Sequence, residues 1–268
     1  MNEFDQPDYD AFTQQLIQQY NEIAQLAGAL AHEIKNPLSV IRMNVDLLTE
    51  DLIEEDQPVN RRRSLQKIQI VQRQCERLQN LLNDFLKFAR VRKLDLTPGS
   101  LNEQIERVLD LFEAQADENR VEILRYLDPE LPSIMQDEQP LEAALVNLVK
   151  NSLEAMPEGG ELTARTRQTR KGVALDLIDT GCGMDENTAI HMFDAFYSTK
   201  EGGSGLGLPT ARKVIEAHGG RIDVQSEVGH GTQFTLEFPV PARLEDAQTA
   251  STGEPSTEKP DPGHSTEI

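Results

Sequence analysis

The chain has 268 residues and a formal net charge of −20, from 46 acidic and 26 basic residues. Its length allows one or two domains, and its charge argues against general affinity for nucleic acid or anionic lipid. No apolar run approaches the roughly 20 residues of a spanning helix, and the first residues, MNEFDQPDYD, lack the basic and apolar regions of a secretory signal. We therefore expect a cytoplasmic protein without membrane insertion or direct nucleic-acid binding, in which Cys75 and Cys182 stay reduced.

The N-terminal part of the chain predicts an antiparallel helical hairpin. Apolar residues alternate by three and four in two segments, separated by the polar stretch EEDQPVNRRRS, with the turn around residues 53–64. The two stripes are Ile34, Leu38, Ile41, Val45, Leu48 and Leu52, then Ile68, Val71, Cys75, Leu78, Leu82, Phe85 and Ala89. A lone hairpin buries only a narrow seam, so we expect a homodimer that forms a four-helix bundle with Cys75 in the core.

Beyond the hairpin the pattern changes to that of an α+β domain. Pro98 and Gly99 mark a linker, after which Ser100 caps a helix that runs to about residue 119. A second helix is expected from Glu138 to Met156, capped by Asp137, and a third around residues 207–218. The expected strands are VEILRYL, ELTARTRQ, GVALDLID, RIDVQSE and GTQFTLEF, largely antiparallel.

The expected division of the chain follows from these changes of pattern. An N-terminal extension occupies residues 1–22, the hairpin 23–93, the linker 94–100 and the α+β domain 101–240. The last stretch, 241–268, is rich in Pro, Ser, Thr, Glu and Gly, and we expect it to be disordered.

Two glycine clusters, DTGCGMD at 179–185 and GGSGLGL at 202–208, mark a candidate nucleotide site. In the second cluster, Gly203, Gly205 and Gly207 come directly before a helix. Backbone N–H groups and the positive end of the helix dipole bind phosphates at such a place. A flexible loop with no ligand is the alternative interpretation.

Three polar side chains accompany the glycine clusters. Asp179 ends a strand, where its carboxylate can accept the amino group of adenine or simply form an Asx-turn. Asn147 and Asn151 are four residues apart on a helix and so share a face. Their amide oxygens suit Mg²⁺, and an internal hydrogen-bonded pair is the alternative.

The segments NLVKN, DTGCGM, FDAFYSTK and GSGLGL, in this order, resemble the asparagine box, first glycine box, phenylalanine box and second glycine box of sensor histidine kinases. LAHEIKNPL resembles their phosphoacceptor box, closest to the nitrogen-regulator type. The resemblance covers roughly residues 23 to 240 and implies a multidomain protein. In such a protein a dimeric four-helix bundle precedes an α/β sandwich of the Bergerat type, which binds ATP and Mg²⁺.

The resemblance also implies roles for individual residues. Asp179 would bind adenine, Asn151 would ligate Mg²⁺, and Asn147 would support the metal and the phosphates. Phe193 and Phe196 would belong to a mobile lid. The remaining positions of the nucleotide site carried over from the family are Lys150, Gly181, Gly183, Lys200, Gly203, Gly205, Leu206, Gly207, Leu208 and Thr232.

His32 is the candidate phosphoacceptor. At about 100° per residue it points away from Ile34 and Ile41, so it is exposed, which by itself also fits a histidine without function. A zinc-protease helix is excluded because its second ligand position holds Asn36. The neighbouring Glu33 can accept the second ring proton and keep the imidazole nucleophilic. Pro37 is expected to bend the helix at this turn.

The function expected from this resemblance is ATP-dependent phosphorylation of His32, followed by transfer to an aspartate on a separate response regulator. The resemblance also implies dephosphorylation of that regulator through Asn36. In hydrolytic relatives a glutamate stands where this chain has Asn147, and an amide cannot act as a general base, so water attack is expected to be slow. The input is expected from an upstream sensor protein or a fused helix. A nucleotide-controlled scaffold and an ATPase are the alternative functions.

Overall fold

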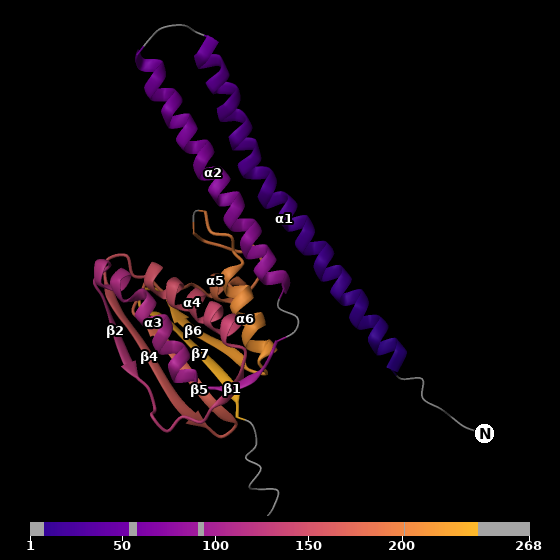
Figure 1. Cartoon of the computed structure of the whole chain (residues 1–268), viewed down its shortest axis with the longest axis vertical. Coiled ribbons are helices and arrows are strands. Elements are labelled where there is room, and N and C mark those ends of the chain that lie inside the picture. The colour runs from indigo at the N-terminus through magenta and orange to yellow at the C-terminus, as the bar shows by residue number, and fades with distance from the viewer. Residues whose placement is uncertain (1–7, 54–57, 91–93, 201, 241–268) are drawn as a thin grey trace, which may run out of the picture.

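The computed structural model describes residues 8–53, 58–90, 94–200 and 202–240, and its first part is a long antiparallel helical hairpin (Figure 1). Helix α1 spans Asp8–Ile53 and helix α2 spans Pro58–Arg90. The turn is therefore shorter than the expected 53–64, since α2 already begins at Pro58, a residue whose fixed φ suits the first helical position. α1 also includes residues 8–22, so most of the expected N-terminal extension is helical.

Several apolar positions of the predicted stripes remain exposed on the single hairpin. Leu38 and Leu82 are each 50% exposed, Val45 is 45% exposed and Ile68 is 43% exposed. Cys75, which we expected in the core, is also exposed, and this expectation is wrong for the single chain. Among the helices that the structure describes, none combines the length and the apolar character needed to cross a bilayer.

The second part is a two-layer domain in which three helices cover one face of a mixed sheet (Figure 1). The helices are α3 (Leu101–Glu118), α4 (Glu138–Glu154) and α6 (Gly207–Ala217). The sheet has the order β2-β4-β5-β7-β6, in which β2 and β4 are parallel and the other neighbours antiparallel. Its strands are β2 (Val121–Tyr126), β4 (Gly160–Thr169), β5 (Gly172–Asp179), β6 (Arg221–Glu227) and β7 (Gly231–Pro239). The hairpin and sandwich expected from the sequence are confirmed.

Three short elements were not expected. β1 (Thr97–Gly99) lies within the expected linker and pairs with β3 (Ile134–Gln136), where Pro98 is opposite Met135. The helix α5 (Glu186–His191) follows the first glycine cluster, and Asp185 caps it by accepting a hydrogen bond from the N–H of Thr188. The expected disordered tail lies outside the described residues.

The ends of the helices are held by side chains. Ser100 caps α3 as expected, because its hydroxyl accepts a hydrogen bond of 3.3 Å from the N–H of Glu103. Asp137 stands at the N-cap of α4, but its carboxylate accepts from the N–H of Asp95 instead. The buried imidazole of His218 ends α6. Its Nδ1 is 2.7 Å from the carbonyl oxygen of Val214, and its Nε2 accepts from the N–H of Asp137 at 3.0 Å.

Candidate functional site

A cavity of about 660 Å³ lies between the sandwich and helix α2. Its wall on the sandwich side contains most of the predicted nucleotide residues. They are Asn147, Lys150, Asn151, Asp179, Gly183, Lys200, Gly203, Gly205, Gly207, Leu208 and Thr232. Residues from α4, the end of β5 and the second glycine cluster, distant in the sequence, thus meet at one cavity.

Asp179 is held at the floor of this cavity by backbone N–H groups. Its side chain is buried, and its Oδ1 accepts hydrogen bonds from Gly181 at 3.0 Å and Thr232 at 3.1 Å. Burial raises the pKa of this carboxyl, and the two backbone donors only partly offset the effect. The contact with Gly181 is the Asx-turn that we considered as an alternative, so the turn and a ligand-binding role are compatible. Gly181 itself is buried and acts through its backbone.

A second buried carboxylate on β5, Asp176, has the opposite electrostatic environment. Burial alone would raise its pKa, but hydrogen bonds from Arg167, Thr235 and Arg165 outweigh this and leave the pKa below its usual value. Asp176 is thus satisfied by its neighbours, whereas the pKa of Asp179 is raised beside an open cavity. This contrast makes Asp179, and not Asp176, the candidate for a ligand-binding carboxylate on this strand.

Ser152 adds an unsatisfied polar group to the cavity wall. Its hydroxyl is buried within reach of the Asp179 carboxylate, but it makes no well-formed hydrogen bond to any described residue. A buried polar atom without a partner costs about 1–3 kcal/mol. A ligand with donors and acceptors, such as an adenine base, would satisfy both side chains, so the residues present fit a nucleotide.

The two asparagines of α4 face the part of the cavity next to the second glycine cluster. The Oδ1 of Asn151 accepts a hydrogen bond of 2.7 Å from the ammonium of Lys200. Lys200 also pairs with Glu154, whose other oxygen lies 3.8 Å from the Nζ of Lys150. The amide oxygen assigned to Mg²⁺ thus has Lys200 as its partner in this structure, and a metal ion bound to it would take the place of that ammonium. Within the described residues, no cluster of three or more His, Cys, Asp or Glu side chains is placed to hold a metal ion.

The second glycine cluster approaches its neighbours more closely than a side chain would allow. Gly205 has φ +64°, and a Cβ added there would lie 2.4 Å from the carbonyl carbon of Phe196. The N–H of Phe196 donates to the carbonyl oxygen of Gly205 at 3.0 Å, and Phe196 itself has φ 68°. A left-handed conformation is rare for a bulky residue and marks local strain. This cluster leads directly into α6, whose first residue Gly207 is next to Asn147.

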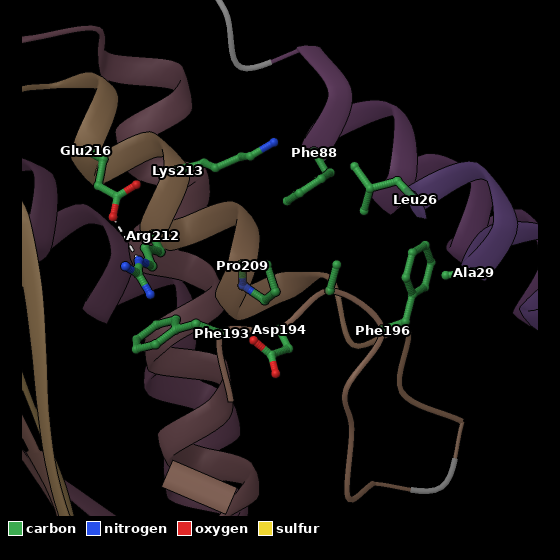
Figure 2. Close-up of a pocket in the computed structure, with 11 residues that line it drawn as sticks. Leu26, Ala29, Phe88, Phe193, Asp194, Phe196, Pro209, Arg212, Lys213 and Glu216 are labelled. Atoms are coloured by element: carbon green, nitrogen blue, oxygen red, sulfur yellow. Dashed lines mark hydrogen bonds and ion pairs between the residues drawn. The ribbon is translucent and has the colours of Figure 1, made fainter. Parts of the chain in front are cut away.

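Phe193 and Phe196 lie outside the nucleotide cavity, where they line a second groove of about 570 Å³ shown in Figure 2. The opposite wall of this groove comes from the hairpin, with Leu26 on α1 and Phe88 on α2. Cation–π contacts accompany the aromatic rings. Arg212 is 5.3 Å from the ring centroid of Phe193, and the Nζ of Lys213 is 3.7 Å from that of Phe88.

Leu206 also lies away from the nucleotide cavity. It is fully buried and packs with Leu81 and Phe88 of the hairpin. Among the predicted nucleotide residues outside the cavity, Phe196 and Leu206 pack with the hairpin, whereas Phe193 packs against the core of the sandwich. We refer to residues 192–200 and 202–206, which carry them, as the lid segment.

The expected phosphoacceptor turn lies at the rim of the cavity. His32 is 73% exposed, as its helical position predicted, and Asn36 is exposed as well. Neither lines the cavity, but Glu33 does. The Oε1 of Glu33 is 3.9 Å from the Nδ1 of His32, too long for a hydrogen bond but close enough for one to form after a small side-chain rotation. Glu33 therefore connects His32 with the nucleotide cavity.

Several residues that line the cavity were not found from the sequence. Ser152 and Glu154 follow Asn151 on α4. A polar residue on the buried face of this helix could have pointed to Ser152, but no comparable signal pointed to Glu154. Arg77 and Asp84 of α2 line the cavity from the hairpin side. Their spacing along α2 is that of a solvated helix face, so only the tertiary arrangement reveals them.

Two family models match the chain. Residues 22–93 match the His Kinase A (phospho-acceptor) domain, and residues 136–242 match the histidine kinase-, DNA gyrase B- and HSP90-like ATPase. The chain is 34% identical over 241 residues to the sensory histidine kinase/phosphatase NtrB of Klebsiella oxytoca, covering 85% of this chain and 66% of NtrB. It is 31% identical over 219 residues to the signal transduction histidine-protein kinase AtoS of Escherichia coli (strain K12), covering 81% of this chain.

The chain spans only 35% of AtoS, so this relative is much longer than the sequence described. A similar solved structure is that of full-length ShkA in complex with AMPPNP. It is 28% identical, with a TM-score of 0.58, and the match covers 82% of this chain and 47% of ShkA. The hairpin and the sandwich thus have relatives in sequence and in structure.

Proposed function

Because the chain belongs to the two-component sensor histidine kinases, of the type that NtrB represents, we propose that it transfers the γ-phosphoryl group of ATP to its own His32. The phosphoryl group then passes to an aspartate on the receiver domain of a separate response regulator. One observation carries this proposal: the cavity that contains Asp179 and Asn151 is also lined by Glu33, which lies beside His32.

Nucleotide binding is the first step of the proposed reaction. The raised pKa of Asp179, the unsatisfied hydroxyl of Ser152 and the glycine-rich approach to α6 support an adenine nucleotide in the cavity. AMPPNP in ShkA is a nucleotide of the same class. Asn151 and Asn147 would hold Mg²⁺, which neutralises phosphate charge when bound. Lys200 and Lys150, near Asn151, supply further positive charge for the phosphates.

Transfer to His32 needs a neutral imidazole with a free lone pair. Because Nδ1 faces Glu33, Nε2 is the nitrogen that attacks the γ-phosphorus. The bond from that phosphorus to the bridging oxygen breaks, and ADP leaves. After a small side-chain rotation that closes the 3.9 Å separation, the Glu33 carboxylate accepts a hydrogen bond from the N–H at Nδ1. This bond keeps the ring in the reactive tautomer and stabilises the charge that develops on it.

Further parts of the proposal concern the partners. Asn36, one turn after His32 on the exposed side of α1, positions a water molecule to dephosphorylate the regulator, an activity that the name of NtrB includes. A second copy of the chain covers the exposed apolar positions of the hairpin. An upstream sensor protein supplies the input. The free thiols of Cys75 and Cys182 support a cytoplasmic location.

The domain boundaries at 23–93, 94–100 and 101–240 also remain part of the proposal. The family match at 22–93 supports the first of them, and the match at 136–242 begins well after residue 101. β1, which lies within 94–100, pairs with β3 and so favours a shorter linker.

Incubation with γ-labelled ATP tests the proposed function. We expect acid-labile, base-stable label on the wild-type chain and none on His32→Ala. Label that survives His32→Ala would show that another residue is the acceptor. Rapid release of free phosphate without labelled protein would identify an ATPase instead. Purified candidate receiver domains, added to the labelled protein, identify the regulator by loss of label from His32.

A further inference from the structure

Helix α2 forms the wall of the nucleotide cavity opposite the sandwich. Arg77, Asn80, Asp84 and Lys87 are spaced by three and four residues, so they lie on one helix face, and all of them line the cavity. The hairpin is therefore a polar wall of the nucleotide site as well as the carrier of the phosphoacceptor.

Arg77 is the residue of this wall that contacts the phosphoacceptor turn. A guanidinium nitrogen of Arg77 lies 3.8 Å from the Oε2 of Glu33, while the Oε1 of Glu33 lies 3.9 Å from the Nδ1 of His32. The Arg77 and Glu33 side chains are partly covered, with 37% and 29% of their surface exposed. The two oxygens of one carboxylate thus face two different partners, one on each helix of the hairpin.

This arrangement restricts the orientation of Glu33. A glutamate on a helix surface samples several rotamers, and few of them direct an oxygen toward the preceding residue. A guanidinium is always charged and presents a rigid fork of donors that holds one carboxylate oxygen. At 3.8 Å the contact between Arg77 and Glu33 is an ion pair and not a hydrogen bond, and its attraction favours orientations that leave the other oxygen on the side of His32.

We propose that Arg77 is a positioning residue, which holds the Glu33 carboxylate beside His32 at the rim of the nucleotide cavity. This inference rests on the proposed autophosphorylation of His32. Arg77 acts through Glu33, so its effect belongs to the transfer step and not to nucleotide binding. A guanidinium that instead bound the phosphates of ATP would alter nucleotide affinity, and the two roles are therefore separable.

The experiment uses the full chain with the variants Arg77→Ala, Arg77→Lys, Glu33→Gln and the double variant Arg77→Ala/Glu33→Gln. The initial rate of His32 labelling is measured at saturating ATP, and the Kd for a fluorescent ATP analogue is measured separately. Arg73, one turn earlier on α2, is exposed and does not line the cavity, so Arg73→Ala is the matched control.

We expect Arg77→Ala to lower the labelling rate about tenfold while the Kd stays within about twofold, because a small misplacement of a catalytic group has effects of this size or larger. Arg77→Lys recovers part of the rate. In the Glu33→Gln background, Arg77→Ala changes the rate less than about twofold, since its only route of action is already lost. Arg73→Ala leaves both quantities unchanged.

Three results overturn the role of Arg77 and leave the proposed function standing. The first is an unchanged labelling rate in Arg77→Ala. The second is an Arg77→Ala variant whose only change is a higher Kd for the ATP analogue. The third is an Arg77→Ala substitution that lowers the labelling rate equally with and without Glu33→Gln. A wild-type chain without His32-dependent label contradicts the proposed function itself and, with it, this role. Thermal unfolding of each variant shows whether a lost rate reflects a lost fold.

Discussion

The hydroxyl of Ser204 donates a hydrogen bond of 2.7 Å to the carboxylate of Asp84. Ser204 belongs to the second glycine cluster and Asp84 to helix α2, so this bond joins the lid segment to the hairpin. Both residues line the nucleotide cavity. In this arrangement a negative charge faces the place where the phosphates of ATP are expected to bind.

Removing that charge is expected to favour nucleotide binding. Asparagine at position 84 still accepts a hydrogen bond from Ser204 but no longer repels phosphate. Partly exposed charges interact by about 0.2–1 kcal/mol, so Asp84→Asn is expected to lower the Kd for a fluorescent ATP analogue by about 1.4-fold to fivefold. Glu76→Gln, an exposed carboxylate of α2 outside the cavity, is the matched control. Weaker binding by Asp84→Asn would contradict this prediction.

Asp179→Asn is expected to abolish most of the ATP affinity. The asparagine oxygen can still accept from Gly181 and Thr232, so the fold is preserved, but an amide presents a donor where the adenine amino group needs an acceptor. An unpaired polar group costs about 1–3 kcal/mol, which corresponds to a Kd raised by about fivefold to 150-fold. Calorimetric titration measures the Kd, and circular dichroism checks the fold. Unaltered affinity would exclude Asp179 as the adenine acceptor.

The two carboxylates of β5 predict opposite dependences of stability on pH. The pKa of Asp176 is lowered in the folded chain, so its stabilising contribution is present above the usual value of 3.8 and is lost as the pH falls below it. The pKa of Asp179 is raised, so between 3.8 and the folded pKa the native state binds more protons. The contribution of Asp179 to the free energy of unfolding therefore decreases as the pH rises through that window.

Denaturant unfolding of the wild type, Asp176→Asn and Asp179→Asn between pH 3 and 7 tests this difference. The destabilisation caused by Asp176→Asn is expected to be larger at pH 7 than at pH 3. Asp179→Asn is expected to gain stability relative to the wild type as the pH rises. Parallel curves for the three proteins would show that neither carboxyl has a shifted pKa.

Phosphoryl transfer within one chain is expected from the position of Glu33. Glu33 lines a cavity that is formed by the sandwich of the same chain. The Oε1 of Glu33 lies 3.9 Å from the Nδ1 of His32, also in the same chain. Wild-type protein is mixed with an excess of the double variant His32→Ala/Asn151→Ala, which lacks the proposed acceptor and one of the two proposed metal ligands. If transfer is within one chain, label per wild-type chain stays constant as mixed dimers form.

Transfer between chains gives the opposite result, because each wild-type chain then faces a partner without a working site. Label per wild-type chain would fall toward zero with increasing excess of the variant. Differently tagged chains that are purified together show that mixed dimers have formed.

The exposed apolar positions of the hairpin predict a dimer that a single charge disrupts. Leu82 is 50% exposed on α2, and Leu82→Asp is expected to give a monomer at micromolar concentration in sedimentation equilibrium. Leu111 on α3 is 65% exposed outside the hairpin, so Leu111→Asp tests whether any apolar-to-charged change has this effect. Only monomer in the wild type would exclude the dimer.

Local patterns in the sequence predicted the parts of the fold that have strong local signals. The heptad stripes gave both long helices, and Ser100 with Glu103 gave the start of α3. β1 and β3 were missed because each has three residues and is specified by pairing with the other. Asp137 was expected to cap α4, but a backbone N–H from a distant residue competes for its carboxylate.

The candidate site was predictable where glycine, asparagine and aspartate occur in fixed spacing. The sequence did not show which surfaces the lid segment packs against. Phe193 and Phe196 were assigned to the nucleotide site, yet neither lines its cavity, because Phe193 packs against the apolar core of the sandwich and Phe196 against the hairpin. The contact between Lys200 and Asn151 joins residues far apart in the chain and depends on the tertiary fold.

The two hydrogen bonds of His218 have a mechanical consequence. They fasten the C-terminal end of α6 to the N-terminal end of α4, while the opposite end of α6 begins at the glycine cluster beside Asn147. Gly205, with φ +64°, lies two residues before the start of α6. Within the same segment, Ser204 donates a hydrogen bond to Asp84 and Leu206 packs with Leu81 and Phe88, and all three partners are on α2. The stretch of chain that leads from the nucleotide cavity into α6 therefore also contacts the helix that carries Arg77.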